Sequence, residues 1–301
     1  MASISEMNLS HLIGQKVGSS TILKELARGG MGAVFIAYQG TLKRQIAVKV
    51  LPKSILSPAT ANIFQQEAEA AAILSHPNII PIYEVGDTGE FLFFTMQLVQ
   101  GNPLSYYIKR ARKNVLPSKR ILPLKPTLEI VISVLDALDY AHSQDIVHRD
   151  IKPGNILIEG HTGRPIIMDF GVAQVSKSSD ETSTMIVGTP IYMPPEQILN
   201  SKVDGRADIY ATGTMLFEML ISEPLFPGMN SIQDLLTMKL ERKGQLFAQM
   251  PSERNPKLNK EMDEILLEAL SYDPEIRYAK CRDFRDALEH YRDRFLVSKA
   301  A

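Results

Sequence analysis

The hydrophobic pattern of this chain changes near residue 100, and that change limits the folds available to it. Over residues 20–99 apolar and polar residues mostly alternate, as they do along half-buried strands, with one helical stretch among them. Beyond this region the apolar residues recur every three or four positions, which is typical of helices with one buried face. We therefore predict an α+β fold with two lobes. Residues 20–99 form a small β-rich lobe with one helix, residues 100–301 form a larger, mostly helical lobe, and residues 1–19 form an N-terminal extension.

The composition and charge of the chain disfavour several classes of function. Of the 301 residues 45% are hydrophobic and 22% are charged, which is typical of a globular protein with a core. The 33 basic residues are balanced by 34 acidic ones, so the charge favours no nucleic-acid partner. The single cysteine, Cys281, cannot form an internal disulfide bond. The chain has no secretory signal and no apolar run of about 20 residues, so we expect a cytoplasmic location and no membrane contact from this segment.

A glycine-rich turn, Ala27-Arg28-Gly29-Gly30-Met31-Gly32, joins two of the expected strands. Glycine allows backbone N–H groups to approach a phosphate closely, although a tight hairpin without a ligand explains the turn equally well. A dinucleotide-binding turn would open a helix, whereas Val34 and its successors continue as a strand. The turn is therefore either a phosphate site of another kind or a tight hairpin without a ligand.

Two charged residues lie on apolar faces, one in a strand and one in a helix. Lys49 lies within the apolar strand Ile46–Val50, and Glu67 lies on the apolar face of the helix that begins at Ser57-Pro58. A charge on an apolar face is costly unless it has a partner. The two residues could therefore pair with each other, or Lys49 with a phosphate; the alternative is that both side chains reach out to solvent.

The segment His148-Arg149-Asp150-Ile151-Lys152-Pro153-Gly154-Asn155 concentrates polar groups between apolar residues. Asp150 can accept a proton from a hydroxyl nucleophile. Lys152 can neutralise charge on a transferring phosphoryl group, and the amide oxygen of Asn155 can bind a hard cation such as Mg²⁺. Asp169, at the abrupt end of a later apolar strand, is a second candidate ligand for Mg²⁺, although strands often end in this way.

In their order and spacing these motifs resemble those of eukaryotic-type protein kinases, most closely the bacterial Ser/Thr kinases, from about residue 20 to about residue 295. The resemblance implies the bilobal protein-kinase fold, with ATP and Mg²⁺ as cofactors and Mn²⁺ as an alternative metal. It implies transfer of the ATP γ-phosphate to Ser or Thr hydroxyls of protein substrates. It also implies activation by phosphorylation of the activation loop, residues 169–196, in trans within a homodimer.

The resemblance assigns a role to each matching residue. Lys49 would bind the α- and β-phosphates and pair with Glu67, Asp150 would deprotonate the substrate hydroxyl, and Thr189 would bridge Asp150 and Lys152. Asn155 and Asp169 would hold Mg²⁺. The residues implied to surround ATP are Ala27, Gly29, Gly30, Gly32, Val34, Ala47, Lys49, Met96, Gln97, Val99 and Leu157. Among them Met96 would be the gatekeeper and Gln97–Val99 the hinge, and Ala27 stands where the family usually has glycine.

Further features distinguish branches of the family. Lys152, two residues after Asp150, and Gly188-Thr189-Pro190-x-Tyr192 match the Ser/Thr branch rather than the Tyr branch, although a dual-specificity enzyme is an alternative. Glu196 would pair with Arg277, and Asp208 would cap the backbone of the catalytic loop, the segment His148–Asn155 described above. The hydroxyls implied to accept the activating phosphate are those of Thr182, Ser183 and Thr184. The alternative is a polar activation loop that is not modified.

Two other functions remain as alternatives. A scaffold protein on the same fold would be expected to lack one of Lys49, Asp150, Asn155 and Asp169, and all four are present. A kinase of small molecules would share the catalytic Asp and Asn but lack Pro194-Pro195-Glu196 and its arginine partner. Residues 109–126, with seven basic and no acidic side chains, are interpreted as a solvated surface insertion, with a docking role as the alternative.

Overall fold

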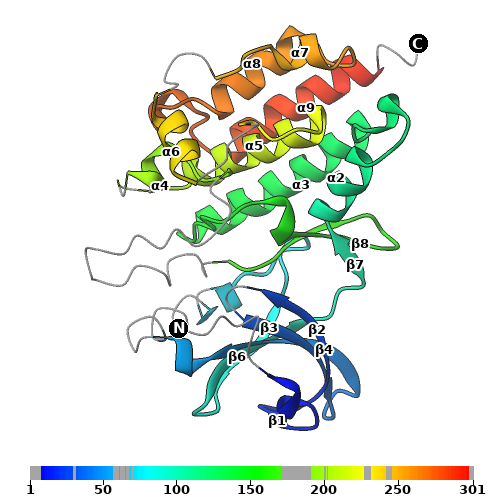
Figure 1. The fold of residues 1–301 in the computed structure, drawn as a ribbon, viewed down its shortest axis with the longest axis vertical. Coiled ribbons are helices and arrows are strands. Elements are labelled where there is room, and N and C mark those ends of the chain that lie inside the picture. Colours follow the sequence, from blue (N-terminus) through cyan, green and yellow to red (C-terminus); the bar gives the residue numbers. More distant parts are fainter. Residues whose placement is uncertain are drawn as a thin grey trace. The chain divides into compact units, whose positions relative to one another are not determined.

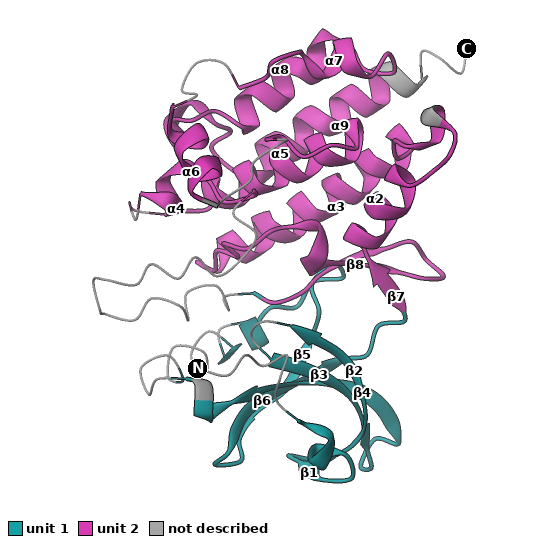
Figure 2. Ribbon diagram, in the orientation of Figure 1, with its two compact units in different colours: residues 1–100, 170–186 teal, residues 101–169, 187–301 magenta. Residues whose placement is uncertain are grey.

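The computed structural model describes residues 8–29, 32–56, 61, 65, 68–69, 71–170, 191–199, 201, 203–226, 232–241 and 246–297. The chain divides into two compact units (Figure 2). The first comprises residues 1–100 and 170–186, and the second comprises residues 101–169 and 187–301.

The first unit is built on an antiparallel sheet of six strands in the order β1-β2-β3-β4-β6-β5 (Figure 1). The strands are β1 (Lys16–Val17), β2 (Ser20–Gly29), β3 (Gly32–Gln39), β4 (Arg44–Pro52), β5 (Ile82–Asp87) and β6 (Phe91–Gln97), with short 3₁₀ turns η2 (Ser10–Leu12) and η3 (Lys53–Ile55). These strands confirm the prediction made from the alternation of apolar and polar residues in this region. Residues 61, 65, 68–69 and 71–72 are helical and fall within the helix expected after Ser57.

The core of this unit begins earlier in the chain than the sequence pattern indicates. Leu9, Leu12 and Val17 are buried with Phe35 and Val48 in one apolar cluster. Part of the expected N-terminal extension therefore belongs to the core of the sheet. Its three buried apolar side chains are too widely spaced to form a period in the sequence.

The second unit is mostly helical, as the three-to-four-residue pattern predicts (Figure 1). A small antiparallel sheet contains β7 (Gly101–Pro103), β8 (Ile156–Glu159) and β9 (Pro165–Ile167). The helices are α2 (Leu104–Arg112), α3 (Leu124–Ser143), α4 (Pro195–Ile198), α5 (Arg206–Ile221), α6 (Ile232–Glu241), α7 (Pro251–Arg254), α8 (Lys260–Ala269) and α9 (Cys281–Val297). Three short 3₁₀ turns join them, η4 (Pro117–Lys119), η5 (Pro153–Asn155) and η7 (Pro274–Ile276).

Helix α5 forms the centre of the second unit. Every residue from Ala207 to Ile221 is buried, because the helix is apolar around nearly its whole circumference and α3, α8 and α9 pack on it. Gly213 allows close packing, since a Cβ atom there would lie 3.1 Å from the Cβ of Ala269 on α8. This buried helix carries Asp208, which supports the candidate site.

Two surface properties bear on the predictions. The basic segment, residues 109–126, contains the end of α2, η4 and the start of α3, and its Val115 and Leu116 side chains are exposed. Within the described part of the chain, no helix combines the length and the apolar character needed to cross a membrane.

Candidate active site

The second unit brings together two predicted catalytic residues, Asp150 and Lys152, and the predicted metal ligand Asn155. Oδ2 of Asp150 accepts a hydrogen bond from Nζ of Lys152 at 2.6 Å and another from Nδ2 of Asn155 at 2.9 Å. The preceding residue, Arg149, has a φ of +64°, in the left-handed region that L-residues rarely adopt. Such a conformation persists only where the surrounding contacts fix it, and it marks this loop as a constrained segment.

Asn155 is oriented so that its amide oxygen is the atom it can offer to a ligand. Its amide nitrogen is already used, because Nδ2 donates to the backbone oxygen of Asp150 at 2.8 Å as well as to its carboxylate. An amide oxygen beside a carboxylate suits a hard divalent cation. The described residues around Asn155 therefore fit the Mg²⁺ that the kinase motifs imply.

Asp169 follows strand β9, and the catalytic loop holds the end of this strand at two points. The N–H of Met168 donates to the backbone oxygen of Asn155 at 2.9 Å, and Nε2 of His148 donates to the Met168 oxygen at 2.8 Å. Asp169 itself has a φ of +58°, a second left-handed residue in the site. The two predicted metal ligands therefore lie on segments that are hydrogen-bonded to each other.

Asp208 on α5 supports the catalytic loop from the buried side. Its carboxylate accepts the backbone N–H of His148 at 2.9 Å and that of Arg149 at 2.8 Å, which confirms the predicted backbone cap. Nε2 of His142, in the last turn of α3, lies 2.8 Å from the same carboxylate. Sequence reasoning missed His142, whose only signal is one polar residue near the end of an apolar helix.

The pKa values of this pair are shifted in the directions that stabilise an ion pair. Burial by itself would raise the pKa of Asp208, but the hydrogen bond and charge of His142 outweigh it, so the pKa lies below its usual value. Burial would lower the pKa of His142, but the hydrogen bond and charge of Asp208 hold it above its usual value. Gly205 makes room for the imidazole, since a Cβ there would lie 2.6 Å from Nδ1 of His142.

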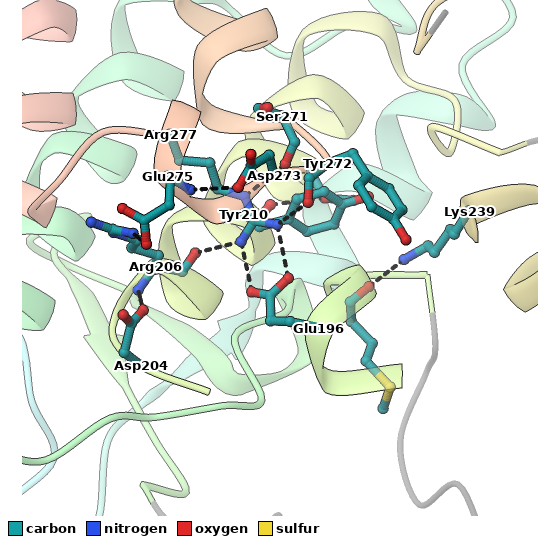
Figure 3. Close-up of polar contacts among 12 residues, drawn as sticks. Glu196, Asp204, Arg206, Tyr210, Lys239, Ser271, Tyr272, Asp273, Glu275 and Arg277 are labelled. Atoms are coloured by element: carbon teal, nitrogen blue, oxygen red, sulfur yellow. Dashed lines mark hydrogen bonds and ion pairs between the residues drawn. The ribbon is translucent and has the colours of Figure 1, made fainter. Parts of the chain in front are cut away.

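The predicted pair of Glu196 and Arg277 is also confirmed (Figure 3). The two guanidinium nitrogens reach the two carboxylate oxygens at 2.7 and 2.8 Å, and both side chains are buried. Arg277 also donates to the Ser271 oxygen at 2.7 Å and lies over the ring of Tyr210. This bidentate, fully hydrogen-bonded geometry is the arrangement in which a buried ion pair is tolerated. It fixes the start of α4, directly after residues 191–193.

In the first unit, strand register places five of the predicted ATP-binding residues on one face of the sheet. Val34 pairs with Lys49, Ala47 pairs with Met96, and Ala27 pairs with Val34. Directly opposed residues share a face, and so do Ala47 and Lys49, two positions apart on β4. Lys49 is only 8% exposed, and its Nζ lies 5.6 Å from the ring centroid of Phe94.

Strands β2 and β3 pair along their length up to Gly29 and Gly32, the described glycines of the glycine-rich segment. Any residue other than glycine at position 32 would clash, because a Cβ atom there would lie 2.5 Å from the backbone oxygen of Val50. Gln97 ends β6, Val99 follows it and is half-buried, and Leu157 lies in β8 of the second unit. The remaining predicted residues fall outside the described part of the chain: Gly30, Glu67, Thr189, Thr182, Ser183 and Thr184.

Comparison with known proteins agrees with this geometry. The family model described as protein kinase domain matches residues 20–291, so the chain belongs to the protein kinase domain family. The chain resembles the probable serine/threonine-protein kinase SCO3848 of Streptomyces coelicolor, with 36% identity covering 88% of this chain and 38% of the relative. It resembles PknF, a serine/threonine-protein kinase of Mycobacterium tuberculosis, with 35% identity covering 92% of this chain and 57% of the relative.

A solved structure confirms the predicted kinase fold. A double mutant of the Mycobacterium tuberculosis PknI kinase domain matches with a TM-score of 0.74 and 27% identity, covering 94% of this chain and 99% of that one. The chain spans 38–57% of the length of the curated relatives named above.

Proposed function

We propose that this chain is a protein serine/threonine kinase domain that transfers the γ-phosphate of ATP to hydroxyl groups of protein substrates. The observation that supports this most strongly is the cluster of Asp150, Lys152 and Asn155 on a loop whose backbone is fixed by buried Asp208. A scaffold protein would have no use for a carboxylate, a cation and an amide held in mutual hydrogen bonds. The family and the names of the relatives support the same activity.

Asp150 is proposed to orient the substrate hydroxyl and accept its proton, while Lys152, 2.6 Å from that carboxylate, neutralises charge on the phosphoryl group in transit. Asn155 and Asp169 are the residues that would hold Mg²⁺, which neutralises phosphate charge when it is bound. Lys49 would bind the phosphates from its apolar strand. We propose that Ala27, Val34, Ala47 and Met96, on the same face of the sheet, contact the nucleotide.

The choice of Ser and Thr over Tyr is supported by Lys152. Its ammonium bonds directly to Asp150, so the cation lies where the phosphoryl group would be transferred. We also propose activation by autophosphorylation at Thr182, Ser183 or Thr184, in trans between two copies. Nε of Arg149 is buried and has no hydrogen-bond partner among the described residues, which suits a guanidinium that receives a phosphate.

The test is incubation of the pure protein with γ-labelled ATP and Mg²⁺, beside Asp150→Asn, with phosphosites mapped by mass spectrometry. We expect label on Ser and Thr in the wild type, including Thr182–Thr184, and a loss of transfer of at least about 10³-fold in the variant. ATP binding should be retained, because Asp150 faces the hydroxyl rather than the nucleotide. Equal turnover of the variant would refute the assignment of the base. ATP binding without transfer by the wild type would favour the scaffold function.

A further inference from the structure

Helix α6 carries a buried lysine to which the proposed catalytic mechanism gives no role. Lys239 is 3% exposed, although a lysine is rarely buried unless its ammonium has partners. Its Nζ donates to the backbone oxygen of Ile191 at 2.6 Å and to that of Met193 at 2.6 Å. The ring centroids of Tyr210 and Phe226 each lie 5.4 Å from this Nζ.

These contacts form part of a three-point attachment of residues 191–193. The two carbonyls that bind Lys239 flank Tyr192, and the hydroxyl of Tyr192 donates to Glu218 on α5. Glu218 is held in turn by Arg112 of α2 at 2.6 Å. Two helices therefore fix residues 191–193. Helix α6 binds the backbone carbonyls of Ile191 and Met193, and α5 binds the side chain of Tyr192.

A lysine at this position indicates that the orientation of the two carbonyl groups matters here, as well as the packing. An apolar side chain of similar length, such as Met, would fill the same space without the cost of removing an ammonium from water. Only a donor can hold two carbonyl groups that flank one residue, and a charged donor makes hydrogen bonds about twice as strong as a neutral one. The geometry is therefore that of a cation that fixes the path of the backbone.

We propose that Lys239 is a positioning residue for the protein substrate: it fixes the backbone of Ile191–Met193 in the conformation that binds the segment around the phosphorylated residue. This inference rests on the proposed function and on the resemblance of Gly188-Thr189-Pro190-x-Tyr192 to the segment with which Ser/Thr kinases bind their substrates, of which the structure describes Ile191 and Tyr192. Lys239 itself touches neither ATP nor substrate. It acts through the carbonyls that it holds, so its loss should weaken peptide binding and leave nucleotide binding unchanged.

The attachment of residues 191–193 by Lys239 should depend on pH, because burial shifts the pKa of this lysine. Burial lowers the pKa of Lys239 to about 7, while the charge of Glu196 raises it. Glu196 on α4 is bound to Arg277. Burial raises the pKa of Tyr210 on α5, so Tyr210 stays neutral near pH 7. As pH rises through 7 the ammonium becomes an amine, its two hydrogen bonds lose their charge assistance, and the KM for peptide should rise.

The test compares Lys239→Met and Lys239→Arg with the wild type, and uses Lys257→Met, which removes an exposed lysine of the same unit, as the matched control. The substrate is a Ser-containing peptide taken from a mapped autophosphorylation site. At pH 6.5 we expect Lys239→Met to raise the KM for peptide about tenfold, with the KM for ATP within about twofold. Lys239→Arg should restore most of the peptide affinity and show no change of KM between pH 6.5 and 8.5, whereas the KM of the wild type should rise over that range.

Hydrogen exchange provides a second readout that does not depend on activity. In Lys239→Met the amides of Ile191, Tyr192 and Met193 should exchange faster, while those of α3 and of the catalytic loop should not change. An unchanged peptide KM, or equal effects on peptide KM, ATP KM and kcat, would overturn the proposal. If Lys239→Met does not fold, the pH dependence of the wild type against Lys239→Arg decides. If the wild type transfers no phosphate, the proposed function fails, and the hydrogen-exchange result still tests the attachment.

Discussion

Two buried charges in the second unit fix two backbone segments in opposite ways. Asp208 on α5 is an anion that accepts hydrogen bonds from the backbone N–H groups of His148 and Arg149, at the start of the catalytic loop. Lys239 on α6 is a cation that collects the C=O groups of residues 191 and 193, in the segment proposed to bind substrate. Each side chain satisfies backbone groups that no helix or strand would satisfy.

The two charges differ in how their burial is compensated. Asp208 has an ionisable partner in His142, and the pair shifts both pKa values toward the charged forms. Lys239 is held by carbonyl dipoles and aromatic rings, and burial lowers its pKa to about 7. The comparison teaches that an ionisable partner shifts the pKa of a buried group toward its charged form, whereas at Lys239 the effect of burial dominates and lowers the pKa.

The largest effect should come from a third buried charge that has a full ionic partner. Arg277→Met removes a bidentate cation and leaves Glu196 buried and unpaired, so the free energy of unfolding should fall by about 3–5 kcal/mol. Chemical denaturation measures this change. The double variant Glu196→Gln with Arg277→Met should recover part of the loss, and a double variant no more stable than Arg277→Met would contradict the pairing.

Asp208→Asn breaks the anionic support while preserving its shape. The amide keeps one acceptor oxygen but leaves His142 without its counter-charge, so we expect the unfolding free energy to fall by about 3 kcal/mol. We also expect kcat to fall by about 100-fold, because the loop that carries Asp150 loses its attachment. Steady-state kinetics under conditions where the variant is fully folded would measure this, and a kcat within twofold of the wild type would show that the loop does not need the anion.

The contributions of Lys239 and of His142, the partner of Asp208, to the free energy of unfolding should change with pH in opposite directions. Because the pKa of Lys239 is lowered from 10.5 to about 7 in the folded state, the unfolded chain binds more protons between these values, and this residue makes stability rise with pH. The difference in unfolding free energy between the wild type and Lys239→Met should therefore increase above pH 7, with a slope approaching about 1.4 kcal/mol per pH unit. Denaturation at pH 6.5, 7.5 and 8.5 measures it, and a flat difference would contradict a neutral Lys239 above pH 7.

The smallest effect should come from His142→Gln. This change replaces the ionisable partner of Asp208 with a neutral donor, so Asp208, like Lys239, is then bound by neutral groups. The folded pKa of His142 is raised, so its contribution is fully present below its unfolded pKa of about 6.5 and is lost as pH rises through the raised value. At pH 6 the variant should lose about 1 kcal/mol, and the loss should shrink with increasing pH. A loss that does not depend on pH would mean that the imidazole acts only as a neutral donor.

Much of the fold and of the site follows from local sequence pattern. The alternation in residues 20–99 predicts the strands of the first unit, and Lys49, which lies within one of them, is buried. Helix α5 is buried all round because its sequence is apolar all round. The backbone cap by Asp208 and the pairing of Glu196 with Arg277 follow from the resemblance to the kinase family and are present in the structure.

Only the tertiary structure shows which distant groups meet. Lys239 binds carbonyls 46 and 48 residues away, and His142 binds a carboxylate 66 residues away. In the sequence Lys239 is one basic residue near the end of a short helix and reads as solvated. Periodicity identifies the buried face of an element but not what that face meets, and a carbonyl acceptor leaves no mark in the sequence because every residue has one. The sequence by itself therefore determined the class of fold and the chemistry of the catalytic loop, and the packing of α5 and α6 decided how that loop and residues 191–193 are held.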